Sequence, residues 1–308
     1  MKLNISKYAK EILKIDTIGF TDSLIPSEDI ENYRNYLQAG NYEDMLWLET
    51  RQQIRENPKL LLDGVKTVIV VGANYYHNTS KKDYDISIYA NQQQDYHIWL
   101  YEKVKLLSEF ISNTYSSNNR YFVDSAPILE KVFAKKTSIG WQGKHTCIVS
   151  REFGSWLFLG VILTDLQIEP DIPHKNMCGT CTKCIDSCPT QALTPYKLET
   201  KKCISYLTIE NKNDIDESLH KDLGDKIFGC DICLKACPFN KWQSDTLHIE
   251  AQENEKFPKS IDDFKNLKQE EFKKIFKNTP LQRTGYAKLQ NNLDIAVKNK
   301  KMVDYNLN

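Results

Sequence analysis

The sequence predicts an α+β fold with a layered N-terminal part, a cysteine-rich middle part and a helical C-terminal segment. Strand-like and helix-like stretches alternate up to residue 166, as in a sheet that is covered by helices. Eight of the nine cysteines lie between residues 178 and 240, and a basic stretch with helical spacing follows them. We therefore expect three domains, at residues 1–166, 167–245 and 246–308.

The composition gives no sign of export or of a general attraction to nucleic acid or membranes. Lys and Arg together number 41, and so do Asp and Glu, so only a local patch could bind a polyanion. The N-terminus has no secretory or twin-arginine signal, and no apolar run reaches transmembrane length. We expect a cytoplasmic protein without a membrane partner, whose cysteines serve metal or redox chemistry rather than disulfides.

The first elements along the chain are a helix and a strand. Residues 1–20 read as an amphipathic helix with Leu3, Ile12, Leu13 and Ile15 on one side. The β-branched run at 66–76 is typical of a buried strand.

The next elements complete the layered part. Residues 95–111 have apolar side chains at helical spacing, and residues 120–136 read as strand, turn and helix. Pro127 suits the first turn of that helix. Residues 155–166 are a second candidate for a buried strand.

The first cysteine run has the spacing C-x2-C-x2-C-x3-C-P of two-cluster ferredoxins. Its members are Cys178, Cys181, Cys184 and Cys188, followed by Pro189. In this pattern three thiolates from one loop bind one cluster, and the fourth cysteine starts a helix and binds the other cluster. The second run repeats the spacing with Cys230, Cys233 and Cys237, but Ile227 stands where its first cysteine is expected.

The two runs predict two [4Fe–4S] clusters. We expect the first cluster to be bound by Cys178, Cys181, Cys184 and Cys237. We expect the second to be bound by Cys188, Cys230, Cys233 and Cys203, which lies between the runs and replaces the ligand missing at Ile227. The alternatives are a three-cysteine [3Fe–4S] cluster and zinc bound by the CxxC pairs. Cys147 is left over and reads as a small buried apolar residue.

Nearly the whole chain resembles the epoxyqueuosine reductases, the cobalamin-dependent enzymes of the last step of queuosine synthesis on tRNA. The resemblance rests on segments such as YFVDSAPILEKVFAKKTSIGWQGKHT, EFGSWLFLGVILTDL, CISYLTIE and TPLQRTGYAKLQNN. Val161 departs from the family, which commonly has Glu there. The resemblance implies a nitroreductase-like cobalamin domain beside the ferredoxin-like module, and a short form without the C-terminal helical-repeat domain of longer members.

The resemblance also implies the reaction. An epoxide on the modified wobble base is reduced to the alkene of queuosine by cobalamin, which the two clusters reduce. Breaking the C–O bond leaves an alkoxide that needs a proton, and the family's acid matches Asp124. A carboxyl beside an apolar corrin keeps its proton more readily than one in water. From the residues alone, Asp124 ahead of Pro127 reads equally as a helix N-cap.

Further site residues follow from the resemblance. The positions that match residues near cobalamin are Arg55, Asp124, Ile148, Leu159 and Ser205. Arg55 could instead form a surface ion pair, and Ile148 and Leu159 could be ordinary core residues. His97 could line the nucleoside pocket or be an ordinary hydrogen-bonded histidine. Lys212 and the basic C-terminal helices could contact tRNA phosphates or form a solvated surface.

Two other functions share parts of this pattern. A cobalamin-dependent reductive dehalogenase also has paired clusters, but such enzymes usually carry a twin-arginine signal and use Tyr as the proton donor. An electron-transfer ferredoxin would leave the α+β part without a role. We expect an enzyme that acts as a monomer and receives electrons from a flavodoxin- or ferredoxin-like donor.

Overall fold

The chain, described by a computed structural model at residues 1–241 and 243–305, divides into two compact units. The first unit comprises Met1–Asn74 and Tyr96–Cys181, and the second comprises Tyr75–Asp95 and Thr182–Asn308. The boundaries of these units differ from the predicted domain boundaries, which lie after residues 166 and 245. The difference arises because the segment Tyr75–Asp95 leaves the first unit and packs its Tyr84 with Phe257 and other residues of the C-terminal part.

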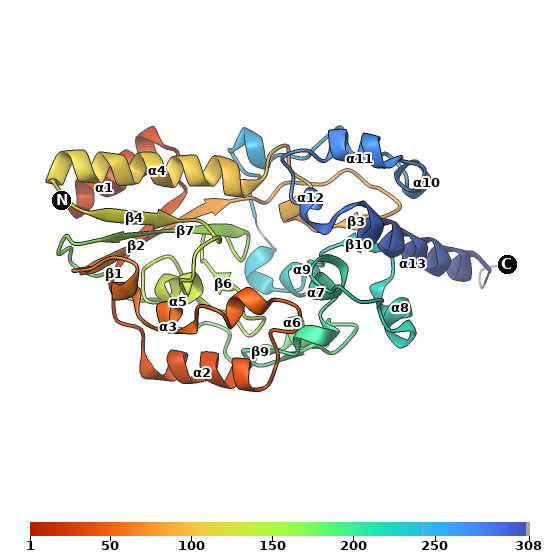
Figure 1. The fold of residues 1–308 in the computed structure, drawn as a ribbon, viewed down its shortest axis with the longest axis horizontal. Helices are drawn as coiled ribbons and strands as arrows, with labels where there is room; N and C mark the ends of the chain where they lie inside the picture. The colour runs from red at the N-terminus through yellow and green to blue at the C-terminus, as the bar shows by residue number, and fades with distance from the viewer. Residues whose placement is uncertain (242, 306–308) are drawn as a thin grey trace. The chain divides into compact units, whose positions relative to one another are not determined.

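A four-stranded antiparallel sheet forms the centre of the first unit (Figure 1). In spatial order its strands are β1 (Thr17–Asp22), β2 (Thr67–Asn74), β7 (Leu157–Thr164) and β4 (Asn119–Phe122). All of β2 is buried, as is most of β7, which accounts for their continuous apolar sequences. The strands predicted within residues 66–76 and 155–166 are confirmed.

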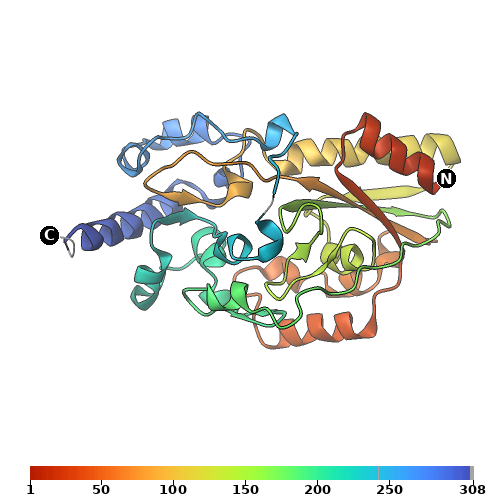
Figure 2. The same ribbon diagram turned by 180° about the vertical axis from the view of Figure 1, so that it is seen from behind.

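Helices cover both faces of this sheet (Figures 1 and 2). α4 (Tyr96–Tyr115) packs against β4 and β7, and α5 (Glu130–Lys135) packs against β2 and β7. Gly160 of β7 permits the approach of α4, because a Cβ atom there would lie 2.7 Å from Val104 Cγ2. Further elements of the unit are α2 (Ser27–Gln38), α3 (Gln52–Glu56), β5 (Trp141–Gln142) and β6 (Ile148–Val149).

The N-terminal helix is shorter than predicted and buries a different face. α1 (Lys2–Lys7) continues as a π-helical turn over Tyr8–Ile12, and β1 follows. Leu13 is buried as predicted, but Leu3 is 82% exposed and Ile12 is 63% exposed, so that part of the prediction is wrong. The buried side is formed instead by Ile5, Ala9 and Leu13, which are four residues apart and therefore lie on one side of a helix.

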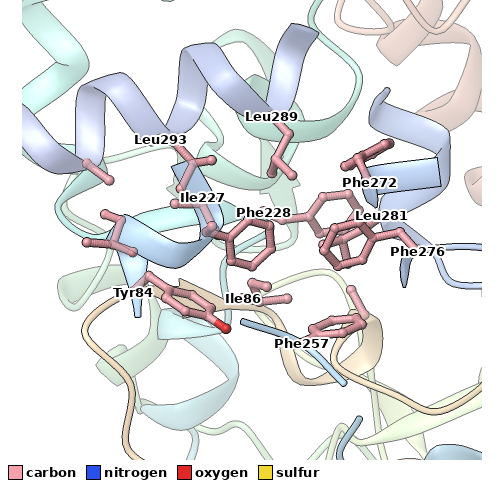
Figure 3. Packing of buried hydrophobic residues seen from close by; sticks show 14 residues of the cluster. Tyr84, Ile86, Ile227, Phe228, Phe257, Phe272, Phe276, Leu281, Leu289 and Leu293 are labelled. Carbon is pink, nitrogen blue, oxygen red and sulfur yellow. The ribbon is translucent and has the colours of Figure 1, made fainter. Parts of the chain in front are cut away.

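The second unit is mostly helical and is built around an aromatic core (Figure 3). β3 (Asp85–Ile86) and β10 (Lys226–Phe228) form a parallel pair at its centre. The other elements are α6 (Lys183–Asp186), β8 (Leu193–Thr194), β9 (Lys197–Leu198), α7 (Ile204–Ile209), α8 (Glu217–Leu223), α9 (Ile232–Lys235), α10 (Ile261–Lys265), α11 (Gln269–Ile275), α12 (Leu281–Thr284) and α13 (Tyr286–Tyr305). The predicted helical C-terminal segment is thus confirmed. Within the described ranges, no helix is both long and apolar enough to cross a membrane.

Candidate active site and cluster module

Asp124 lies in the short loop that joins β4 to α5. Its φ angle of 54° is in the left-handed region, which costs a non-glycine residue on the order of 1 kcal/mol, although Asp adopts it more readily than most. The N-cap of α5 is Leu129, so Asp124 does not cap this helix and the N-cap alternative is wrong. Pro127 also precedes the helix instead of lying in its first turn, so that prediction is wrong as well.

The Asp124 carboxyl is held by two residues at the start of α4. The Tyr96 hydroxyl donates a hydrogen bond of 2.6 Å to Oδ2, and His97 Nε2 lies 3.3 Å from the same oxygen. The Tyr96 ring stacks on Phe158 of β7, with the ring centroids 4.1 Å apart. The Asp124 side chain is nevertheless 51% exposed. One side of the carboxyl is therefore oriented by the protein, while the other is accessible to a substrate.

Arg55, on α3, is buried beneath the same loop. Its Nη1 lies 3.4 Å from the carbonyl oxygen of Ala126, and its Nη2 lies 3.2 Å from that of Trp47. Burial lowers the pKa of the guanidinium, and the nearby Glu130 and Asp124 oppose this effect. Within the described part of the chain, Arg55 Nε is a buried donor without a hydrogen-bond partner. Such an atom is expected where a bound group completes a site, and the alternative of a surface ion pair is wrong.

Glu130, the first residue of α5, is a second carboxyl beside Asp124. Its Oε1 accepts a hydrogen bond of 2.9 Å from the main-chain N–H of Asp124. Burial, followed by the negative charge of Asp124, raises the pKa of Glu130 to about 8. Near neutral pH most Glu130 side chains are therefore protonated, which avoids two adjacent carboxylates.

This raised pKa makes the stability of the protein depend on pH. A carboxyl whose folded-state pKa lies above its ordinary value of 4.5 destabilises the fold progressively as pH rises from about 4.5 to about 8. Glutamine does not ionise, so Glu130→Gln should have a higher melting temperature than wild type at pH 8, with the difference shrinking toward pH 5. Thermal unfolding at the two pH values measures this effect. The exposed Glu102, replaced by Gln, is the control, and a pH-independent difference would contradict the raised pKa.

The other residues predicted near cobalamin lie in different environments. Ile148 of β6 is only 5% exposed and belongs to the hydrophobic cluster between the sheet and α5, which favours the core alternative. Leu159 of β7 is half-buried at the edge of that cluster, so it keeps apolar surface that a ligand could cover. Ser205 is half-buried on α7 in the second unit.

The first cysteine run begins with a tight turn in the first unit. The N–H of Cys181 donates to the carbonyl oxygen of Cys178 at 3.0 Å. The Lys144 Nζ atom donates to the carbonyl oxygens of Gly179 at 2.8 Å and Cys181 at 3.0 Å. The ammonium group therefore ties both ends of this turn to the loop that carries Lys144.

The central cysteines of both runs lie in the second unit. Cys184 is on α6 and Cys233 is on α9, and these two helices pack against each other. Cys203 is the N-cap of α7, which packs against β10 ahead of Cys230. Burial raises the pKa of the Cys230 thiol to about 11, and the Cys203 thiolate acts in the same direction. The fold thus brings Cys203 close to Cys230.

Ile227 occupies the position at which the second run lacks a cysteine. It is the middle residue of β10 and is completely buried in the aromatic core (Figure 3). Asn292 of α13 also donates a 2.9 Å hydrogen bond to the carbonyl oxygen of Ile227. A side chain at this position packs into the core and is not available to a cluster. Position 227 therefore cannot supply a ligand in this fold, and Cys203 stays the predicted replacement.

The cysteines that precede prolines lie in two different local structures. Cys237 precedes a short 3-10 helix, as expected, but Cys188 is followed by a turn, so the predicted helix after Cys188 is wrong. The Cys188 sulfur instead accepts a 3.4 Å hydrogen bond from the N–H of Ala192. The leftover Cys147 is in the first unit and is half-buried instead of fully buried.

The two cysteine runs offer thiolates, which are the ligands of iron–sulfur clusters. No three His, Cys, Asp or Glu side chains among the described residues converge tightly enough to hold one metal ion. A [4Fe–4S] cluster does not require such convergence, because each thiolate binds a different iron atom.

Several of the basic residues predicted to contact tRNA are engaged in ion pairs. Lys212 is exposed. On the C-terminal helices, the pairs of basic and acidic residues are Lys265 with Asp294, Lys273 with Glu270, Arg283 with Glu210 and Lys300 with Asp83. Lys268, Lys274, Lys277 and Lys298 are exposed. The excess of positive charge on this segment is therefore concentrated on a few side chains.

Three residues of the site were not predicted from the sequence. Tyr96 directly precedes the candidate residue His97 in the DYH segment, and that adjacency was a usable signal, although its contact with Asp124 spans 28 residues. Glu130 and Lys144 act through main-chain groups of Asp124, Gly179 and Cys181. Such contacts leave no spacing pattern in a single sequence.

Comparisons with known proteins agree with this architecture. Residues 55–125 match a family model described as epoxyqueuosine reductase QueG, DUF1730, and residues 177–240 match a 4Fe-4S double cluster binding domain. Reductive dehalogenases align with a TM-score of only 0.45 and 14% identity, which is too low to bear on function.

Two solved epoxyqueuosine reductases have the same fold. One is a crystal structure with an epoxyqueuosine-modified stem loop of tRNA-Tyr; it has a TM-score of 0.87 and 27% identity, over 97% of this chain and 81% of that one. The other is the enzyme from Streptococcus thermophilus, with a TM-score of 0.85 and 29% identity over 100% of this chain and 86% of that one.

Sequence relatives cover almost the full length. The epoxyqueuosine reductase of Leadbetterella byssophila is 36% identical over 93% of this chain and 97% of its own length. That of Escherichia coli is 35% identical over 96% of this chain and 82% of its own length. With the sheet, the Asp124 loop and the paired cysteine runs in place, these matches show that the chain belongs to the epoxyqueuosine reductase family.

Proposed function

We propose that this protein reduces epoxyqueuosine at the wobble position of tRNA to queuosine. The observation that carries the proposal is the half-exposed Asp124 carboxyl, held by Tyr96 and His97, in a chain 36% identical to an epoxyqueuosine reductase over nearly its full length. The reaction converts the epoxide to an alkene, consumes two electrons and two protons, and releases the oxygen as water.

The cofactors and the protein divide this chemistry between them. Bound cobalamin, reduced by the two [4Fe–4S] clusters, supplies the electrons that break the epoxide C–O bond. Asp124 donates a proton to the oxygen that is released, because an alkoxide is a poor leaving group without one. Tyr96 and His97 keep the carboxyl aimed at the substrate.

The residues of this chain also suit the binding of the cofactors. Arg55 offers a buried donor without a partner in the described structure, which suits a polar group of cobalamin. Leu159 offers apolar surface for the corrin, and Ser205 is a further candidate contact. We assign Cys178, Cys181, Cys184 and Cys237 to one cluster and Cys188, Cys203, Cys230 and Cys233 to the other. A flavodoxin- or ferredoxin-like protein is the proposed electron donor, and the monomeric state and cytoplasmic location stay predictions.

The tRNA would be held through its phosphates while the modified base leaves the stack. The related structure with an epoxyqueuosine-modified stem loop supports a tRNA substrate. Exposed lysines such as Lys212, Lys274 and Lys277 are the candidate phosphate contacts, and His97 is a candidate contact of the nucleoside.

Binding of tRNA should weaken as salt is added. Each lost phosphate contact should reduce the slope of log affinity against log salt by roughly 0.7–0.9. The Lys212→Gln/Lys274→Gln/Lys277→Gln variant should therefore have a flatter slope than wild type in filter-binding or anisotropy titrations. Lys105→Gln, on α4 and paired with Glu102, is the control. An unchanged slope in the triple variant would refute this surface.

The spectrum of the reconstituted protein separates the enzyme from a plain electron-transfer ferredoxin. After anaerobic incubation with iron, sulfide and cobalamin, followed by gel filtration, the protein should retain the absorption bands of cobalamin as well as those of the clusters. Cluster bands without cobalamin bands would contradict the proposed function.

A further inference from the structure

The loop that carries Asp124 needs external support. Asp124 has a left-handed backbone conformation, and Asp124 and Ser125 are both exposed. Inside the loop, the Ser125 N–H bonds the carbonyl of Val123, and the Ile128 N–H bonds that of Ala126. Each of these hydrogen bonds joins residues only two positions apart, so neither restrains the loop as a whole. A strained, exposed segment keeps one conformation only when surrounding groups fix it.

Two side chains outside the loop provide that support. Arg55 lies at a long 3.4 Å from the carbonyl oxygen of Ala126. Glu130 makes a shorter contact of 2.9 Å with the N–H of Asp124 itself. The main-chain group that Glu130 binds belongs to the same residue whose carboxyl bonds Tyr96. Asp124 is thus held at both its backbone and its side chain.

Glu130 is itself fixed by the core. It opens α5, which packs against β2 and β7 through the buried Phe133 and Ala134. A side chain at the start of such a helix moves little relative to the sheet. The anchor is therefore on a rigid element, and the loop is the part that can move.

We infer that Glu130 is a positioning residue, a latch that holds the Asp124 loop in the active site and releases it when the hydrogen bond to the Asp124 N–H breaks. The inference rests on the proposed function, in which Asp124 is the acid. A solved relative from Bacillus subtilis, with a TM-score of 0.88 and 28% identity over 97% of this chain and 81% of that chain, is described with its catalytic aspartate loop swung out of the active site. The catalytic loop of that relative therefore has a second position, outside the active site.

The charge state of Glu130 fits this role. The groups that act on it electrostatically are Asp124, Lys131 and His97, and Arg55 interacts with it from α3. A protonated Glu130 accepts the N–H through its carboxyl oxygen and does not repel Asp124 once Asp124 has given up its proton. Glutamine keeps such a carbonyl acceptor, whereas alanine removes it, so the two substitutions separate the hydrogen bond from the ionisable group.

Two readouts test the latch. Loss of one hydrogen bond changes a two-state equilibrium by roughly 3- to 10-fold. In Glu130→Ala, hydrogen exchange of the loop peptide over residues 119–129 should speed up by about that factor, and kcat should fall in parallel at unchanged KM for tRNA. Glu130→Gln should remain close to wild type in both readouts. Glu102→Ala, an exposed glutamate on α4, is the matched control.

The Asp124→Asn background gives the decisive comparison. If Glu130 acts through Asp124, adding Glu130→Ala to Asp124→Asn should slow turnover no further. Three results would each overturn the inference. The first is an equal loss of turnover in both backgrounds, and the second is an equal effect of Glu130→Gln and Glu130→Ala. The third is faster hydrogen exchange of the loop without slower turnover. If Glu130→Ala does not fold, hydrogen exchange of the loop in Glu130→Gln decides. Glutamine keeps the acceptor, so faster exchange of the loop in that variant would contradict the role of Glu130 as a hydrogen-bond acceptor. If even the wild type does not turn over, the proposed function fails, while the exchange data still test the latch.

Discussion

Replacing Asp124 with Asn is expected to slow the reduction of epoxyqueuosine at least about 100-fold, the lower range for the loss of a general acid. Asparagine adopts the left-handed conformation as readily as aspartate and can still accept the Tyr96 hydrogen bond. The loop should therefore keep its shape, and the variant should retain cobalamin, both clusters and tRNA binding. Single-turnover conversion of modified tRNA, followed by nucleoside analysis, measures the rate.

The control for this experiment is Asp63→Asn, at an exposed loop position. It should be as fast as wild type. An Asp124→Asn enzyme that is equally fast would remove Asp124 from the mechanism and leave the proton to water or to His97, which lies 3.3 Å from its carboxyl.

The second large effect is expected at Cys203. Cys203→Ala should lose one of the two clusters, so the iron content should fall by up to about half of that of an eight-iron module. Cys147→Ala, in the other unit, should keep both clusters. Iron analysis and electron paramagnetic resonance of the anaerobically reduced proteins report the number of clusters. Equal iron loss in the two variants would mean that the eighth ligand is assigned wrongly.

A cysteine restored at the ferredoxin position provides a further test. Ile227 is completely buried in the aromatic core, so its side chain cannot turn toward a cluster. Adding Ile227→Cys to Cys203→Ala should therefore not restore the lost cluster. Recovery of full iron content would contradict the burial argument.

The sequence predicts the parts of this protein that depend on local patterns. The cysteine spacing identifies both runs because iron ligands in a tight loop need fixed separations. The buried strands at 67–74 and 157–164 are recognisable because both are continuous apolar runs.

Features that depend on tertiary contacts are not visible in the sequence. The segment Tyr75–Asp95 belongs to the second unit through the packing of residues such as Tyr84, and its polar composition does not indicate this. The N-terminal helix buries Ile5, Ala9 and Leu13 and leaves Leu3 and Ile12 exposed, because tertiary packing selects the side that is covered. Glu130 became visible only through its contact with the main chain of Asp124.

Reduction of epoxyqueuosine by this protein is tested by mass spectrometry of the tRNA nucleosides after reaction. The reconstituted protein, cobalamin, an anaerobic reductant and tRNA that contains epoxyqueuosine are combined, and parallel reactions omit cobalamin or the protein. We expect epoxyqueuosine to be replaced by a nucleoside lighter by one oxygen atom, queuosine, only in the complete reaction. Unchanged epoxyqueuosine in the complete reaction, with both clusters and cobalamin verified in the protein, would contradict it.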